Sequence, residues 1–346
     1  MEARTLGAVA PRAAAAAFVV LVQSLVASAA GYRTANFVVD APTPQLAREI
    51  GDAAEQWRLS LAHEWLGQEL PRWSEPCPIK ARVAPQLGAG GATSFVFDQG
   101  EVFDWRMNIQ GSRERILDSV LPHEITHTIF ATHFRRPVPR WADEGACTTV
   151  EHRSEIAKQE HLLLEFLRAG PGRPGRGIPF DAMFRMKEYP EDVLPLYAQG
   201  HSLSVFLMGQ RGKRAFLEFL GDGMTDENWR RAVQQHYGYE HLLALQTAWL
   251  DWVKAGRPAI APSDGALLAD GPAAAPSVSP VSANVTAGTP PVFRGQSPDP
   301  SPPRASSPTT TGAAVDASTA DWSTRPVHAA APQVQMARDP GVSGRR

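Results

Sequence analysis

Half of the prolines in this chain lie in its last quarter, and this uneven distribution limits where a folded core can form. Of the 30 prolines, 15 fall between Pro258 and Pro340, in a stretch dominated by Ala, Pro, Ser, Thr and Gly. Such a composition buries too little apolar surface to offset the entropy of ordering the chain. The sequence therefore predicts a globular part that ends near residue 256, and a disordered tail over residues 257–346.

The first 29 residues have the layout of a secretory signal peptide. Arg4 and Arg12 precede an apolar run from Ala13 to Val26, and Ala27–Ala29 is a small-residue cleavage pattern. The run is short and interrupted for a transmembrane helix, which needs about 20 residues. We therefore expect a secreted or periplasmic protein without stable membrane insertion once the signal is removed; an uncleaved N-terminal membrane anchor is the alternative.

The charge balance and the cysteine count narrow the functional classes further. The 34 basic and 36 acidic residues leave a formal net charge of −2. This argues against nucleic acid as the main partner, because proteins that bind phosphate backbones usually carry an excess of basic residues. Two cysteines exclude a disulfide-dense scaffold. Cys77 and Cys147 can pair in an oxidising compartment, or they can be two separate buried thiols.

The first part of the globular region is typical of a small sheet with one long helix. Asn36–Asp40 reads as a strand, and Thr43 followed by Pro44 predicts the start of an amphipathic helix. Gly88–Gly91 reads as a flexible lead-in, because it lacks the spacing and ending of a phosphate-binding loop. Further strands are predicted, the last two as a hairpin, at Ile79–Val83, Thr93–Phe97 and Val102–Ile109.

The pentapeptide at residues 123–127 is H-E-x-x-H and lies in a mostly helical region that begins near Ser112. Positions i and i+4 share one helix face, so His123 and His127 can bind one metal ion, and imidazole nitrogens suit zinc. Glu124 can then act as the general base toward a zinc-activated water. Ser112 is placed to cap the helix, and Pro122 predicts a kink just before the first histidine because it removes a helical hydrogen bond.

A catalytic zinc site needs three protein ligands and one open position. Four downstream side chains are candidates for the third ligand: His133, Asp143, Glu144 and His152. The metzincin pattern requires a glycine and a third histidine soon after the second one, and residues 128–133 do not supply it.

The segment Pro139–Ala146, which reads PRWADEGA, resembles the W-x-x-E-G-x-A segment of the gluzincin metallopeptidases, the clan of thermolysin and the M1 aminopeptidases. Its spacing from the second histidine is similar to that of the small peptidase MA-like domains of bacterial secreted proteins. The resemblance implies that Glu144 is the third zinc ligand. Asp143, one residue away on another helix face, ranks below it and is a candidate for orienting a ligand.

A second resemblance begins at Leu196, where LYAQG opens an apolar helix. The M1 aminopeptidases carry Y-x-x-G at a comparable position, and their tyrosine hydroxyl binds the oxyanion of the tetrahedral intermediate. The resemblance implies the same role for Tyr197. A tyrosine that caps a core helix is the alternative, and His201 could assist or replace it.

The region before the zinc helix departs from the M1 pattern. Residues 102–111 read VFDWRMNIQG in place of the G-x-M-x-N exopeptidase signature, so nothing indicates an aminopeptidase pocket. In zincins the strand before the metal helix is an edge strand that pairs with an extended substrate. Trp105–Ile109 is the expected counterpart.

These patterns together predict an α+β, zincin-like domain over residues 30–256. A small sheet with an edge hairpin packs on the first helix and the zinc helix, and a helical second lobe follows. The expected activity is zinc-dependent hydrolysis of peptide bonds in a peptide or protein substrate, favoured as an endopeptidase, with one Zn²⁺ per chain. The alternative is a non-enzymatic extracytoplasmic binding or surface protein on the same scaffold.

Overall fold

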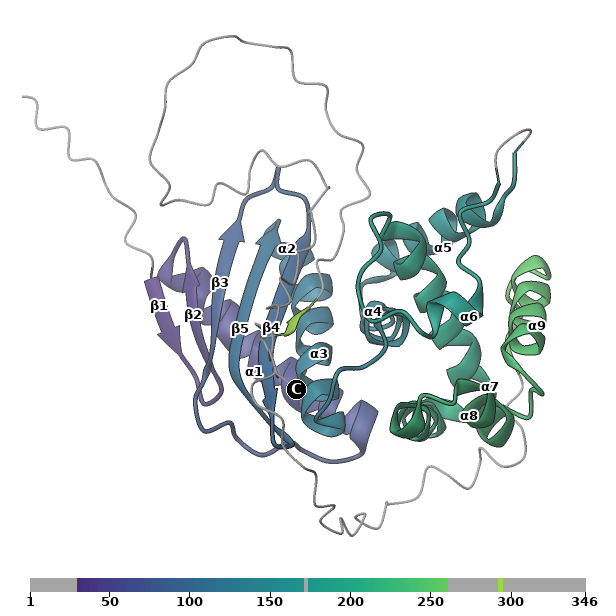
Figure 1. Ribbon diagram of the computed structural model, residues 1–346. Coiled ribbons are helices and arrows are strands. Elements are labelled where there is room, and N and C mark those ends of the chain that lie inside the picture. The colour runs from purple at the N-terminus through teal and green to yellow at the C-terminus, as the bar shows by residue number, and fades with distance from the viewer. Residues whose placement is uncertain (1–29, 171–173, 261–291, 295–346) are drawn as a thin grey trace, which may run out of the picture.

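The computed structural model describes residues 30–170, 174–260 and 292–294. A mixed sheet with two long helices packed against it makes up one part of the fold, and a group of helices lies beside this part (Figure 1). The predicted α+β class is therefore confirmed. The predicted signal peptide lies outside the described residues, and so does most of the predicted tail.

The sheet has the strand order β1-β2-β3-β5-β4-β6. β2 is parallel to β3 and β3 is parallel to β5, whereas β1, β4 and β6 run antiparallel to their neighbours. The strands are β1 (Ala30–Arg33), β2 (Phe37–Ala41), β3 (Cys77–Val83), β4 (Gly90–Asp98), β5 (Glu101–Gly111) and β6 (Val292–Arg294). The predicted strands thus exist, and the glycines at residues 90 and 91 belong to β4 and not to a flexible lead-in.

Helix α1 (Pro44–Leu66) connects β2 to β3, because a parallel pair needs a crossover. The predicted N-cap is confirmed: the Thr43 hydroxyl accepts a hydrogen bond from the Leu46 N–H at 3.2 Å. Gly67 ends the helix in the left-handed region, with φ 72°. The polypeptide then returns to β3 on the far side of β2 from β1.

The β4–β5 hairpin corrects the expectation for the substrate-binding strand. Gln99 and Gly100 form its tight turn with φ 48° and 78°, as the sequence predicts for a hairpin. However, Trp105–Ile109 lies in β5, which pairs with β3 on one side and with β4 on the other. The backbone N–H and C=O groups of β5 are therefore already hydrogen-bonded on both sides, so β5 cannot pair with a substrate. The next strand outward in the hairpin is β4, whose second side faces away from β5.

The approach to the helix that carries residues 123–127 contains an irregularity near Pro122. Ser112 caps α2 (Arg113–Arg115), and a π-helical turn, η1 (Ile116–Val120), leads into α3 (Leu121–Phe134). The Leu121 N–H bonds to the Ile116 carbonyl, five residues back, so the helix widens just before Pro122. This π turn replaces the sharp kink that a proline without an N–H predicts.

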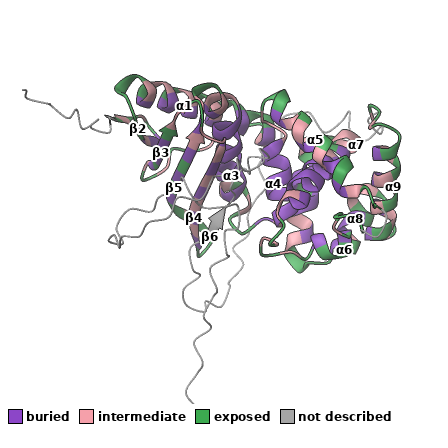
Figure 2. Ribbon diagram, turned by 90° about the horizontal axis from the view of Figure 1, so that it is seen from above, coloured by how far each residue is buried: buried purple, intermediate pink, exposed green. Residues whose placement is uncertain are grey.

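The second part of the fold consists of helices that pack on one another and on α3. They are α4 (Arg140–Thr148), α5 (Arg153–Leu167), α6 (Phe180–Met183), α7 (Leu194–Asp226), α8 (Trp229–Tyr237) and α9 (Leu242–Lys254). α7 is kinked at Gly212, which has φ 76°. Buried residues fill α4 and the faces of α3 and α7 toward it (Figure 2). α4 is therefore central to the second part.

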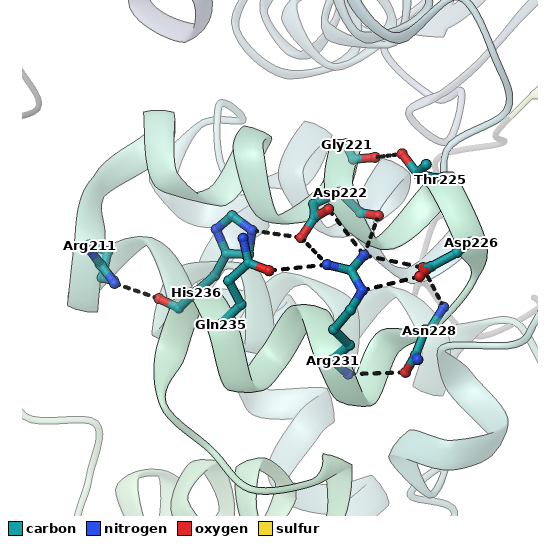
Figure 3. Close-up of polar contacts among 9 residues, drawn as sticks. All are labelled: Arg211, Gly221, Asp222, Thr225, Asp226, Asn228, Arg231, Gln235 and His236. Atoms are coloured by element: carbon teal, nitrogen blue, oxygen red, sulfur yellow. Dashed lines mark hydrogen bonds and ion pairs between the residues drawn. The ribbon is translucent and has the colours of Figure 1, made fainter.

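A polar cluster joins α7 to α8 at the periphery (Figure 3). The Arg231 guanidinium donates to both Asp222 carboxylate oxygens, at 2.7 and 3.0 Å, and to Asp226 at 3.1 Å. His236, also on α8, approaches Asp222 at 3.1 Å. Hydrogen bonding to Arg231 is the main cause that lowers the pKa of Asp222. Each of these side chains keeps contact with solvent.

Both cysteines are free and buried in the structure, which is the second of the two arrangements left open by the sequence. The packed region also continues past residue 256. Arg257 pairs with Glu160 at 3.2 Å, and the Trp252 indole donates to the Pro258 carbonyl. Among the described residues, the helices include none with the length and apolarity to cross a bilayer.

Candidate metal centre

Helix α3 carries the predicted zinc-binding pentapeptide into the interior of the fold. It contacts β4 and β5 on one side and α1 and α4 on others, so all of its residues from Leu121 to Ala131 are buried. His123, Glu124 and His127 are each 0% exposed. Buried polar side chains are costly unless they find partners, and the partners that these three find define the site.

The Nε2 atoms of both histidines face one carboxylate on the neighbouring helix. Glu144, on α4, places its Oε2 3.4 Å from His123 Nε2 and 3.7 Å from His127 Nε2. Within the described part of the chain, all three atoms are buried and lack a hydrogen-bond partner of good geometry. Three orphaned ligand atoms that converge on one point fit a cation, because two imidazoles and a carboxylate are the protein ligands of many catalytic zinc sites.

The other ring nitrogen of each histidine is held by a carboxylate. His123 Nδ1 lies 2.7 Å from Glu151 Oε1, and His127 Nδ1 lies 3.1 Å from Asp143 Oδ1. A carboxylate at Nδ1 keeps the proton there and leaves Nε2 free to bind a metal ion. Asp143 thus lies where the sequence predicts an orienting group, while Glu151 was not foreseen.

The charges of the site favour a cation at this point. Burial opposes protonation of His123 and His127, but the surrounding carboxylates outweigh it, and the pKa of each imidazole is raised. Burial likewise opposes ionisation of Glu144, but the two histidines outweigh it and lower the pKa of that carboxyl. A positive charge shared by these groups, whether carried by protons or by a metal ion, is therefore stabilised.

Cys147 is a second neighbour of the histidines, one helical turn after Glu144 on α4. One ligand atom from each of His123, His127 and Cys147 can be chosen so that all three lie within 4.8 Å of one another, so this buried cluster could hold a metal ion. The Cys147 sulfur lies 3.3 Å from His127 Nδ1, on the side that Asp143 also contacts. Glu144 instead faces the Nε2 atoms of both histidines.

Glu124 is held by the outer strand of the hairpin. The Thr93 hydroxyl, on β4, donates to Glu124 Oε2 at 2.6 Å, while Oε1 is buried without a partner among the described residues. Gly91 lies against the same carboxylate, and any side chain there would clash with it. Burial is the main cause that raises the pKa of Glu124 to about 7, against the opposing charges of the histidines. Such a carboxylate suits proton transfer near neutral pH.

Two glycines explain how α7 reaches the site. A Cβ on Gly145 would collide with the backbone of Gly200, and one on Gly200 would collide with the Trp141 carbonyl. The axes of α4 and α7 can therefore approach closely only because both positions lack a side chain. This close crossing sets Tyr197, at the start of α7, beside Glu144, which directly precedes Gly145.

Two tyrosines contact the Glu144 carboxylate. Tyr189 donates its hydroxyl to Glu144 Oε1, and Tyr197 lies near enough to the same carboxylate for its charge to act on the phenol. Burial first, and the Glu144 charge second, raise the pKa of both phenols well above the usual value. Both hydroxyls are therefore protonated donors at neutral pH. Tyr197 was predicted at this site, whereas Tyr189 lies in a loop where no sequence pattern marks it.

The remaining predicted candidates lie elsewhere. His133 is at the far end of α3, stacked edge-on against Phe134, and His152 caps α5 by accepting from the Ser154 N–H. His201 is buried against the Gly145 backbone, and burial lowers its pKa to about 4. The structure therefore gathers His123, Glu124, His127, Glu144, Asp143 and Tyr197 in one place. It leaves the others outside the cluster.

No family model matches the chain, and no curated protein matches its sequence. The functional assignment accordingly rests on the residues themselves.

Proposed function

We propose that the protein is a zinc-dependent metallopeptidase with a zincin-like fold, similar to the gluzincins and the peptidase MA-like domains. The observation that carries the proposal is the convergence of three orphaned, fully buried atoms, His123 Nε2, His127 Nε2 and Glu144 Oε2. These would hold one Zn²⁺ per chain. A zinc ion bound there would supply Lewis-acid polarisation of a peptide carbonyl and acidify a water molecule.

The remaining residues supply the proton chemistry of peptide hydrolysis. Glu124 has one carboxylate oxygen held by Thr93 and the other free, so it can accept the proton of the attacking water and pass it to the leaving amine. Tyr197 is a protonated donor beside the ligand carboxylate and would stabilise the oxyanion of the attacked carbonyl. The predicted signal peptide supports a secreted or periplasmic location, with peptide or protein substrates met outside the cytoplasm.

Substitution of Glu124 by glutamine tests this proposal, because glutamine keeps the shape and loses the base. The full mature chain and its E124Q variant would be supplied with zinc and assayed on a broad panel of peptides, with and without a chelator. We expect turnover to fall by several orders of magnitude in E124Q while the zinc content stays unchanged.

Glu165→Gln is the matched control, since the Glu165 side chain on α5 is exposed and pairs with His161 at the surface. It should cleave as the wild type does. Equal cleavage by E124Q and wild type would remove Glu124 from the reaction. Zinc binding without any cleavage would favour the non-enzymatic alternative.

A further inference from the structure

The outer edge of β4 is covered by a segment from the predicted tail. β6 pairs antiparallel with β4, with Arg294 opposite Thr93, Phe293 opposite Ser94 and Val292 opposite Phe95. Figure 1 shows β6 alongside β4, and the strand order places it on the side away from β5. The tail segment therefore completes the sheet at the strand that approaches Glu124.

The covered stretch of β4 is the part that touches the candidate base. Thr93, opposite Arg294 in the register, is the residue whose hydroxyl bonds to Glu124 at 2.6 Å. Gly91, two residues earlier on the same face of β4, lies directly against that carboxylate. An extended chain on this edge thus runs alongside the base, where the scissile bond of a substrate would have to lie.

The edge has room for one extended segment only. The inner side of β4 is paired with β5, including Thr93 with Met107 and Ser94 with Arg106. An exposed strand edge takes an added strand through main-chain hydrogen bonds, whatever the sequence of that strand. An occupant from the same chain and a substrate from outside would therefore exclude each other.

The sequence of the tail singles out the segment that does this. Phe293 and Trp322 are the only aromatic residues beyond Ile260, and Phe293 follows the β-branched Val292. Prolines 290 and 291 precede the pair, and a glycine follows at 295. Aromatic and β-branched residues favour strands, and proline and glycine end them, so Val292 and Phe293 form a short strand-favouring pair with a stop on each side.

We propose that residues 292–294 are an intramolecular competitor that occupies the substrate edge of β4 and holds the protein in an autoinhibited state. The inhibition rests on the peptidase function proposed above, whereas the pairing of β6 with β4 does not depend on it. Because the segment belongs to the same chain, its effective concentration reaches the millimolar range, and a short strand suffices.

A double proline substitution in the full mature chain tests the pairing. Strand pairing alternates along the backbone, so one of two adjacent N–H groups points at the partner strand. Phe293→Pro combined with Arg294→Pro therefore removes a pairing hydrogen bond in either register. Val315→Pro combined with Asp316→Pro, farther along the tail, is the matched control.

Two measurements test the pairing of β6 with β4 independently of any catalytic activity. Hydrogen exchange of the β4 amides at residues 90–98 should quicken in the F293P/R294P chain and stay unchanged in the control. A synthetic peptide with the sequence of residues 289–297 should bind the F293P/R294P chain at least about tenfold more tightly than it binds the wild type. Unchanged exchange together with equal peptide binding would overturn the proposal.

Turnover separates this proposal from the proposed function. If both hold, the F293P/R294P chain cleaves peptides with a lower KM than the wild type, at a similar kcat. Quickened exchange and peptide binding without cleavage by any variant would sustain the pairing and remove the peptidase function. Cleavage by the wild type with unaltered β4 exchange in the variant would sustain the function and remove the autoinhibition.

Discussion

Two clusters in this molecule bring histidine together with carboxylates, and they do so in opposite ways. At the junction of α7 and α8, His236, Asp222 and Arg231 keep solvent contact, and the side chains satisfy one another with hydrogen bonds of 2.7–3.1 Å (Figure 3). At the junction of α3 and α4, His123, His127 and Glu144 are fully buried, and the atoms that face one another lack partners.

The difference shows how a structural cluster can be told from a binding site made of the same residue types. Ion pairs at a surface add little stability, and their partners leave nothing unsatisfied. A buried polar atom without a partner costs free energy unless a ligand joins it. The residue types alone therefore do not mark a site. Buried polar atoms that lack a hydrogen-bond partner do.

The largest expected effect is the loss of metal binding when a histidine of the buried cluster is removed. If zinc binding does not change, the contrast between the buried and the surface cluster is wrong. His127→Ala removes one of three converging atoms, so the zinc content should fall from about one per chain to none. Where free zinc exceeds its dissociation constant a thousandfold, binding stabilises the fold by about 4 kcal/mol, and this should be lost as well. Elemental analysis and a thermal melt measure both quantities.

His236→Ala is the control from the other cluster, because it removes a histidine next to a carboxylate at the surface. It should keep one zinc per chain. A wild-type protein purified without chelator that holds no stoichiometric metal would show that the buried atoms are not a ligand set. Equal zinc loss in both variants would mean that burial does not distinguish the clusters.

The next effect identifies the third ligand. Glu144 Oε2 faces both Nε2 atoms, whereas the Cys147 sulfur lies by Nδ1 of His127. Glu144→Gln should therefore weaken zinc affinity by more than the 10- to 100-fold that is typical of losing an outer partner, and Cys147→Ser should change it little. Competition with a chromogenic chelator measures both. The reverse order would assign the ligand set to His123, His127 and Cys147.

A smaller and more selective effect separates the two tyrosines. Removing one oxyanion donor costs about 2.7–4 kcal/mol, or roughly 100- to 1000-fold in rate. Tyr197→Phe should lower kcat and kcat/KM together by this factor with zinc retained. Tyr189→Phe should instead weaken zinc affinity, because Tyr189 holds Glu144, the proposed third ligand.

Steady-state kinetics of the zinc-loaded variants, next to a thermal melt, decides between the roles. If Tyr197 merely caps a core helix, Tyr197→Phe lowers the melting temperature and leaves the activity per molecule near normal. An unimpaired kcat in that variant would leave the oxyanion role without a residue on α7.

Local patterns in the sequence predicted more of this site than long-range ones. The i, i+4 spacing of His123 and His127 and the Thr43 cap depend on neighbouring residues, and a single sequence contains that information. Glu151 and Tyr189 reach the site across turns whose geometry depends on tertiary packing, and nothing in their surroundings marks them. Glu144 was proposed from a resemblance, and its carboxylate lies 3.4 Å and 3.7 Å from the two Nε2 atoms.

Strand neighbours were the least predictable feature. The order of strands in a sheet depends on which edges the rest of the fold leaves open, so the position of β5 between β3 and β4 could not be read from its residues. The pairing of β6 with β4 joins a composition-biased tail to the sheet, and composition predicts disorder for such a tail. Gly91 offered a usable signal, since a glycine in a strand often marks a close approach.

The smallest effect is expected in the surface cluster of Asp222, Arg231 and His236, where a substitution should change stability slightly and leave zinc binding unchanged. Hydrogen bonding to Arg231 lowers the pKa of Asp222 in the folded protein. A depressed carboxyl pKa contributes stability above the unfolded value of about 3.9, and this contribution is lost as the pH falls through the folded value. Arg231→Gln should therefore lower Tm at pH 7 by no more than about 2–4 °C, since the group is exposed.

That difference in Tm between wild type and Arg231→Gln should shrink only as the pH falls below about 4 and through the lowered pKa of Asp222, because Asp222 then takes up its proton in both chains. Thermal melts across this pH range measure it, and zinc content at pH 7 should be the same in both. A gap that widens in acid would show that another group dominates the cluster. A loss of zinc would mean that the surface cluster is coupled to the buried one through α7, which carries both Asp222 and Tyr197.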